Sequence, residues 1–261
     1  MKQLYSFRLI AFAALLLGLS SCGEKMDDFD KTPFEHERLT ELKPLVTGKY
    51  ITYRLDSLVF TNFGRSPEVH SYFVRHVVDA VITDNLGRPS YRIYRYIQDT
   101  LASTPEEWTA NGSYFVTVLD DQVELVEDNL RIIKLHLPVR EEFSWKGNKY
   151  LPADVYEPFG HGFSNDDNMK NWDFTYSAPE SFSYRGNVYN DVTTVEEEDF
   201  SDNVPITLPQ IYAIKTRAQE KYAKNIGLVY RDYELWEYQP NPNGNPFYIG
   251  FGVKMWMVDH N

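Results

Sequence analysis

The chain has 261 residues, a formal net charge of -12 at pH 7 and a single cysteine. This length is sufficient for one sizeable hydrophobic core. Nucleic-acid binding depends on neutralising phosphates, so an acidic chain without a basic patch is not expected to bind DNA or RNA. One cysteine also excludes an internal disulfide framework.

The first residues have the parts of a secretory signal sequence. Lys2 and Arg8 supply positive charge, and residues 9–19 form an apolar stretch too short to cross a hydrocarbon core of about 30 Å. The tetrad Leu-Ser-Ser-Cys at 19–22 follows and resembles a bacterial lipobox. The resemblance implies a signal peptide at 1–21 and acylation, for example with palmitate, of Cys22. An ordinary signal peptide with a chance cysteine is the alternative.

The stretch GEKMDDFD at 23–30 is acidic. It resembles the tag that follows the cysteine in Bacteroidota lipoproteins exported to the outer face of the outer membrane. We expect residues 22–46 to be an acidic lipidated tether, with only a transient helical turn at HERLTELK. The expected location is the cell envelope, with the protein lipid-anchored in the outer membrane and exposed at the cell surface. A periplasm-facing anchor is the alternative.

Residues 47–261 are expected to form a single β domain. Turn signals recur every 10 to 15 residues between runs rich in Val, Ile, Tyr, Phe and Thr, as in antiparallel all-β proteins. The sequence predicts a curved sheet or barrel-like meander of about ten strands, with little helix apart from the signal peptide. The expected strands include 49–60, a hairpin of 69–83 with 90–100, three short strands in 108–139, and 247–260.

Two segments depart from this regular pattern. Residues 151–170 read as a long irregular loop. Residues 207–227 fit a helix with a capping box at Thr207 and Gln210, but apolar residues also alternate from Tyr212 to Ala218. We favour a strand that ends in a turn at 224–227.

Three stretches carry a family resemblance: LVTGKYITYRLDSLVF, EDNLRIIKLHLPV followed by SWKGN, and EKYAKNIGLVYRDYELWEY. They resemble an uncharacterised family of Bacteroidota secreted lipoproteins with a β-rich domain and a GLVY-type hairpin. The resemblance covers most of residues 46–258 and implies a hairpin at YAKNIGLVY. It also implies a turn at Gly227 and core positions for Trp145 and Tyr230. The family has no assigned activity, so no catalytic residue transfers.

Candidate chemistry is sparse. The G-x-S-x-G, P-loop, G-x-G-x-x-G and H-E-x-x-H motifs are absent. His70 and His76 are six residues apart on one predicted strand, about 20 Å, which is too far to share a metal. Asp166 and Asp167, in HGFSNDDN, offer hard oxygen ligands for Ca²⁺, although such loops are more often turns. We expect no other cofactor and no enzymatic activity.

Three classes of function remain. The first is a non-catalytic binding or scaffold role for a partner protein or a glycan, and we favour it. The second is a carrier for a lipid or other apolar ligand, which needs an apolar cavity of roughly 300–1,000 Å³. The third is a hydrolase that uses paired carboxylates in a cleft.

Overall fold

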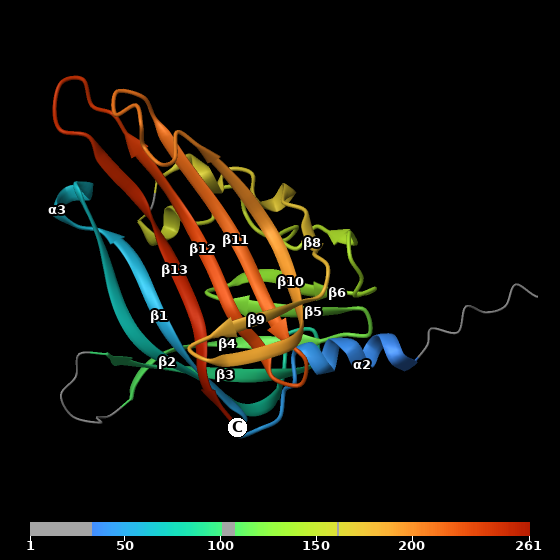
Figure 1. The fold of residues 1–261 in the computed structure, drawn as a ribbon. Helices are drawn as coiled ribbons and strands as arrows, with labels where there is room; N and C mark the ends of the chain where they lie inside the picture. Colours follow the sequence, from blue (N-terminus) through green and yellow to red (C-terminus); the bar gives the residue numbers. More distant parts are fainter. Residues whose placement is uncertain (1–32, 101–107, 161) are drawn as a thin grey trace, which may run out of the picture. The chain divides into compact units, whose positions relative to one another are not determined.

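The computed structural model describes residues 33–100, 108–160 and 162–261 (Figure 1). Within it, Phe34–Asn261 is one compact unit built on a 13-stranded sheet in which all paired neighbours are antiparallel. The prediction of an antiparallel all-β domain is therefore confirmed, with more strands than the ten expected. The signal peptide, Cys22 and the acidic tag lie outside the described residues, so the expectations for them stay predictions.

The described chain contains one regular helix and several short helical turns. They are α2 (Pro33–Leu42), α3 (Thr61–Gly64), η1 (Glu157–Phe159), η2 (Ser164–Asp166) and η3 (Met169–Asn171). The strands are β1 (Tyr50–Phe60), β2 (Ser66–Thr83), β3 (Pro89–Asp99), β4 (Thr109–Val118), β5 (Gln122–Glu127), β6 (Leu130–His136), β7 (Ser144–Trp145), β8 (Phe174–Tyr176), β9 (Glu180–Tyr184), β10 (Asn187–Asp202), β11 (Ala213–Ala223), β12 (Gly227–Gln239) and β13 (Phe247–His260).

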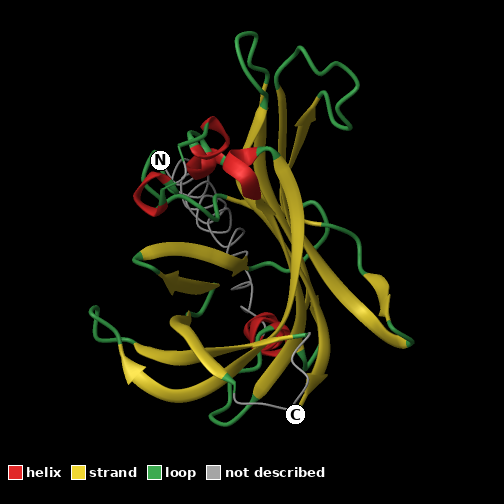
Figure 2. Ribbon diagram, turned by 90° about the vertical axis from the view of Figure 1, so that its left-hand side faces the viewer, coloured by secondary structure: helices red, strands yellow, loops and turns green. Residues whose placement is uncertain are grey.

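The sheet runs in the order β6-β5-β4-β3-β2-β1-β13-β12-β11-β10-β8-β7, with β9 paired to β10. It curls strongly, and its two ends approach each other (Figure 2). Ile133 on β6 donates its N–H to the Gly147 carbonyl at 2.8 Å, and the Trp145 indole N–H donates to the Ile133 carbonyl at 2.9 Å. These bonds join the edge strands, and an edge that is covered offers no template for association with another chain.

The predicted hairpins are confirmed where the turn contains residues with a marked preference for turns. β2 pairs with β3, and Asp84 in the turn accepts hydrogen bonds from the Leu86 and Arg88 N–H groups. Residues 213–223 form a strand, as favoured above, and Gly227 begins the next strand with a φ of 113° that suits glycine. The short β9 was not predicted.

Helix α2 belongs to the packed unit, so that unit begins earlier than the boundary at residue 47 expected from sequence. Leu39 and Leu42 are buried in the core, and the Glu41 carbonyl accepts a hydrogen bond from Asn225 N–H at 2.8 Å. Each fully buried leucine contributes roughly 1.5–3 kcal/mol, which explains why these residues are helical rather than extended. The contact places α2 at the β11–β12 turn.

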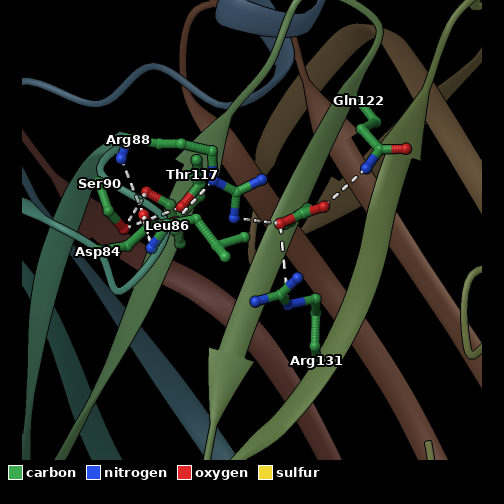
Figure 3. A network of polar contacts seen from close by, with 9 residues as sticks. Asp84, Leu86, Arg88, Ser90, Thr117, Gln122 and Arg131 are labelled. Atoms are coloured by element: carbon green, nitrogen blue, oxygen red, sulfur yellow. Dashed lines mark hydrogen bonds and ion pairs between the residues drawn. The ribbon is translucent and has the colours of Figure 1, made fainter. Parts of the chain in front are cut away.

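A buried carboxylate links the β2–β3 turn to strand β5. Glu124 is 2 % exposed and accepts hydrogen bonds from Arg88 NH2 and Gln122 Nε2, both at 2.8 Å (Figure 3). Arg131 Nε lies 3.9 Å from the same carboxylate, and Arg88 also binds Asp84. Because both oxygens of Glu124 have partners, its burial is compensated. The network is structural and lines none of the cavities discussed below.

Candidate functional site

One open pocket lies where the irregular segment, residues 151–160 and 162–172, meets β12 and β13. We call this segment the pocket loop. The Tyr156 hydroxyl contacts the Tyr233 hydroxyl at 2.6 Å, and the Phe163 ring stacks on Tyr156 and meets the Phe251 ring edge to face. The loop therefore packs against the inner face of the sheet through aromatic side chains. The sequence prediction of a long irregular segment here is confirmed.

The pocket has a volume of about 480 Å³. This is the size range of small-molecule sites in proteins. Its walls combine five carboxylates with uncharged polar and apolar groups and, among the described residues, no lysine or arginine. The lining residues are Asp154, Glu157, Gly162, Phe163, Ser164, Asp166, Asp167, Tyr212, Glu237, Gln239 and Ile249.

Glu237 is a buried carboxylate of the pocket that accepts three hydrogen bonds. It is 2 % exposed and accepts hydrogen bonds from the backbone N–H and the hydroxyl of Ser164, while Gln239 Nε2 donates to its other oxygen at 2.8 Å. Tyr212 stands beside it, and burial together with the Glu237 charge raises the pKa of Tyr212 to about 12. The Tyr212 hydroxyl is therefore protonated at neutral pH, and it lies 3.4 Å from the Ser164 hydroxyl.

The two aspartates predicted from HGFSNDDN line this pocket but differ in role. Asp166 is 2 % exposed and accepts the Tyr156 N–H at 2.7 Å, and burial raises the pKa of its carboxyl. Asp167 is exposed. Within the described residues, no three His, Cys, Asp or Glu side chains are placed to hold a metal ion together. The calcium expectation gains no geometric support, and Asp166 acts as a loop anchor.

Asn165 fixes the pocket loop to the sheet. Its side-chain amide nitrogen contacts the Lys215 carbonyl at 2.8 Å, the Thr216 hydroxyl at 3.1 Å and the Trp236 carbonyl at 3.3 Å. These acceptors belong to β11 and β12. The loop is thus tied to two neighbouring strands of the sheet, which gives its carboxylates defined positions.

Three connections meet at the same end of the strands as the pocket: residues 61–67, 203–212 and 240–247. We call them the loop end. In a chain with 25% charged residues, they contain one charged residue, Arg65, and no acid. Phe63, at the tip of the β1–β2 hairpin, is 92 % exposed, and Leu208 and Ile211 are also exposed. These connections therefore combine exposed apolar side chains with a single charged residue.

The Phe63 tip is also strained. Asn62 and Phe63 have φ values of 49° and 55°, in the left-handed region that costs a non-glycine residue roughly 1–2 kcal/mol. Gly64 allows the hairpin to approach β13, because a Cβ there would lie 2.4 Å from the Tyr248 carbonyl oxygen. Neither packing nor backbone preference explains a phenylalanine at this position.

Aromatic and histidine side chains outside the pocket have structural roles. Trp145, an expected core position, is buried, as are Trp172 and Trp236. His76 Nδ1 lies 3.0 Å from the Tyr114 hydroxyl inside the sheet, whereas His70 is on the exposed part of the same strand. Glu197, within the acidic run at 196–203, is buried against Lys134.

Glu237 and Tyr212 were missed as site residues because they come from strand and loop segments more than 40 residues beyond the aspartates. No local motif marks them. Glu237 and Tyr212 come close to Asp166 only because the pocket loop packs against β12 in the folded chain.

Among the described residues, no helix has the length and apolar character required to cross a bilayer. No family profile matches the chain, and no curated protein is similar to it in sequence. One similar solved structure is a candidate exported protein with a YmcC-like fold from Bacteroides fragilis. It is 11% identical, with a TM-score of 0.35, covering 82% of this chain and 97% of that one.

A second is a candidate lipoprotein from Parabacteroides distasonis. It is 10% identical, with a TM-score of 0.41, covering 83% of this chain and 96% of that one.

Proposed function

We propose that this chain is a lipid-anchored envelope protein that binds a glycan, without catalysis, in the pocket beside Glu237. The observation that carries the proposal is the pocket itself, which is ordered by the Ser164–Glu237 and Asn165 contacts and lined by carboxylate, amide and hydroxyl groups. Sugar hydroxyls donate to carboxylates and accept from hydroxyl and amide groups. Tyr212 and Gln239, which are half-buried, line the pocket together with the exposed carboxylates of Asp154, Glu157 and Asp167, and these groups offer that combination.

The position of the pocket suits a protein tethered at its other end. α2, where the described chain begins, contacts the β11–β12 turn, and β12 extends for 13 residues from that turn to the pocket. At about 3.3 Å per residue, the two ends lie roughly 40 Å apart. An anchor on Cys22 would thus leave the pocket end directed away from the point of attachment.

Calorimetric titration of the protein with a panel of neutral and amino-sugar oligosaccharides tests the binding role. We expect at least one saccharide to bind and Tyr212→Ala to weaken its binding at least tenfold. Tyr150→Ala is the matched control, because Tyr150 is an exposed tyrosine outside the pocket and its removal should change nothing. Equal affinity in all three proteins would reject the pocket as the binding site.

The anchor has its own test. Cells that express the protein are fed an alkyne analogue of palmitate, and the purified protein is examined for label. Labelling of the wild type and loss of label in Cys22→Ala are expected, whereas an unlabelled wild type contradicts the lipid anchor. Protease treatment of intact cells then compares wild type with a variant in which Asp27, Asp28 and Asp30 are alanine. Cleavage of the wild type alone supports surface export by the acidic tag.

A partner protein is a second candidate ligand, and the loop end favours it. The exposed, strained Phe63 offers an aromatic anchor of the kind that dominates protein interfaces. The carrier hypothesis receives less support. Two cavities inside the curved sheet have volumes of about 30 Å³ each, far below the space an acyl chain needs.

A further inference from the structure

The buried carboxylates of the described chain fall into two groups. Most of them form an ion pair with a lysine or an arginine, and these are Glu124, Glu197, Glu220 and Glu234. The two others, Asp166 and Glu237, form no ion pair with any described residue, and both line the pocket of about 480 Å³. Within the described chain, buried acids without a cationic partner therefore occur only at the pocket.

Hydrogen bonds compensate these two carboxylates unequally. Glu237 accepts two bonds from Ser164 and one from Gln239, so both of its oxygens have partners. Asp166 is 2 % exposed and accepts the Tyr156 N–H through Oδ2, whereas its Oδ1 accepts no hydrogen bond from another described residue. A buried acceptor oxygen in the wall of a pocket takes its donor from water or from a ligand.

The rest of the pocket wall adds negative charge. Asp154, Glu157 and Asp167 are exposed carboxylates, and the described lining residues include no lysine or arginine. Burial raises the pKa of Asp166, and the charges of Asp167 and Asp154 add to this effect. A cleft lined by charges of one sign concentrates ligands of the opposite sign. The pocket therefore favours a cationic ligand and disfavours an anionic one.

The form of the cation follows from the size of the pocket and from its donors and acceptors. A bare metal ion would find no set of three ligating side chains among the described residues. The volume of about 480 Å³ suits a small organic molecule, and Tyr212 and Gln239 offer hydrogen bonds to hydroxyl groups. An ammonium group has three N–H donors and no acceptor, which matches a wall of carboxylates.

We propose that the pocket selects a saccharide that carries a protonated amino group, with the ammonium placed beside Asp166 and Asp167. This inference rests on the proposed function, because it names the class of glycan that the same pocket takes. N-acetylation of the sugar removes the positive charge and should weaken binding. Uronic acids and sulfated sugars should bind more weakly still, because the carboxylates repel them.

Two trisaccharides that differ only in this charge test the inference. The glucosamine trimer and its fully N-acetylated counterpart are titrated calorimetrically into the full chain at pH 6 and low ionic strength. We expect one glucosamine trimer to bind about tenfold more tightly than the N-acetylated trimer, and the difference to shrink with added salt. Equal affinities, both weakened by Tyr212→Ala, would overturn the inference and leave the glycan site in place. Absence of binding by both trimers would also overturn it, and the glycan proposal would fail as well only if no other saccharide bound.

Asp167→Asn tests the contribution of the wall charge without disturbing the loop. The Asp167 side chain is exposed and lines the pocket, and asparagine preserves its shape. The variant should bind the glucosamine trimer about threefold more weakly and the N-acetylated trimer as the wild type does. Asp128→Asn is the matched control, because it makes the same change of charge in an exposed turn outside the pocket. Equal weakening in both variants would show attraction to the acidic chain as a whole and would overturn the inference.

Discussion

Ser164 and Glu237 are joined by two hydrogen bonds that converge on one oxygen. The Ser164 backbone N–H donates to Glu237 Oε1 at 2.5 Å, and the Ser164 hydroxyl donates to the same atom at 2.6 Å. The residues are 73 positions apart, and the pair fixes the pocket loop against β12. The carboxylate that shapes the pocket is therefore also the one that orders its wall.

Removal of the Ser164 hydroxyl should loosen the pocket loop without unfolding the domain. Ser164→Ala keeps the backbone N–H and loses one hydrogen bond to a charged group, which costs about 1.5–3 kcal/mol. We expect faster amide hydrogen exchange in residues 154–160 and 162–167 and a small loss of stability in urea. Ser181→Ala, which removes an exposed hydroxyl bonded to Asn190, should leave both measurements unchanged. Unaltered exchange in Ser164→Ala would show that the pair does not order the loop.

Breaking an ion pair inside the curved sheet should destabilise the fold far more than breaking one on its outer face. Arg231→Met leaves Glu220 buried with only Lys134 as a cationic partner, and breaking a buried pair typically costs about 3–5 kcal/mol. Lys254→Met removes a partly exposed lysine that bonds Glu234 and Asp232, and such pairs contribute at most about 1 kcal/mol. Urea unfolding of the two variants checks the difference, and equal losses would contradict it.

His76 should make the fold sensitive to mild acid. Its pKa is lowered in the folded protein, mainly by burial, so the unfolded chain takes up a proton first as the pH falls through about 6.5. Stability contributed by neutral His76 is therefore full above pH 6.5 and declines below it. His76→Gln should reduce the loss of stability between pH 6.5 and 5 by roughly 1 kcal/mol. His70→Gln, on the exposed part of the same strand, should retain the wild-type slope in urea unfolding.

Glu220 should make the folding stability depend on pH in a more acidic range than His76 does. Arg231 and Lys134 hold the pKa of its carboxyl well below the usual value of 4.5 against the opposing effect of burial. A carboxyl with a lowered pKa stabilises the fold above its unfolded value, and this stability is lost as the pH falls below about 4.5. Urea unfolding at pH 3 to 5 should therefore show a steeper decline in the wild type than in Glu220→Gln. Parallel curves would refute the assignment.

Phe63 should be dispensable for stability. Its left-handed φ of 55° costs roughly 1–2 kcal/mol, and glycine relieves this strain at an entropic cost of about 0.5–1 kcal/mol. With the ring exposed, Phe63→Gly should stabilise the domain by about 0.5–1 kcal/mol in thermal unfolding. Asn62→Gly should gain less, since asparagine tolerates this conformation. A destabilised Phe63→Gly would mean that the ring packs within the molecule.

The sequence predicts most of the sheet because alternation and turn chemistry act locally. Asp84 and Gly227 each mark a turn by their own backbone and side-chain preferences, and the strands they separate lie where expected. Helix α2 was not predicted as part of the domain. Its stability comes from the burial of Leu39 and Leu42 against a sheet assembled from residues much later in the chain.

The candidate site is harder to predict from sequence, because it also depends on residues that are far apart in the chain. Asp166 and Asp167 were identified because they are adjacent, and the chemistry of their pocket depends on Glu237 and Tyr212. The buried Glu197 lies within an acidic run that reads as solvated. Its environment is set by Lys134 on β6, 63 positions away, and no local pattern encodes that pairing.

The location of the binding site is the central claim, and hydrogen exchange of the full chain with and without a saturating saccharide tests it most directly. We expect slower exchange in residues 154–160, 162–167 and 208–212 and little change in the β9–β10 hairpin. Protection that is confined to the outer face of the sheet, or absent throughout, would contradict a glycan site beside Glu237.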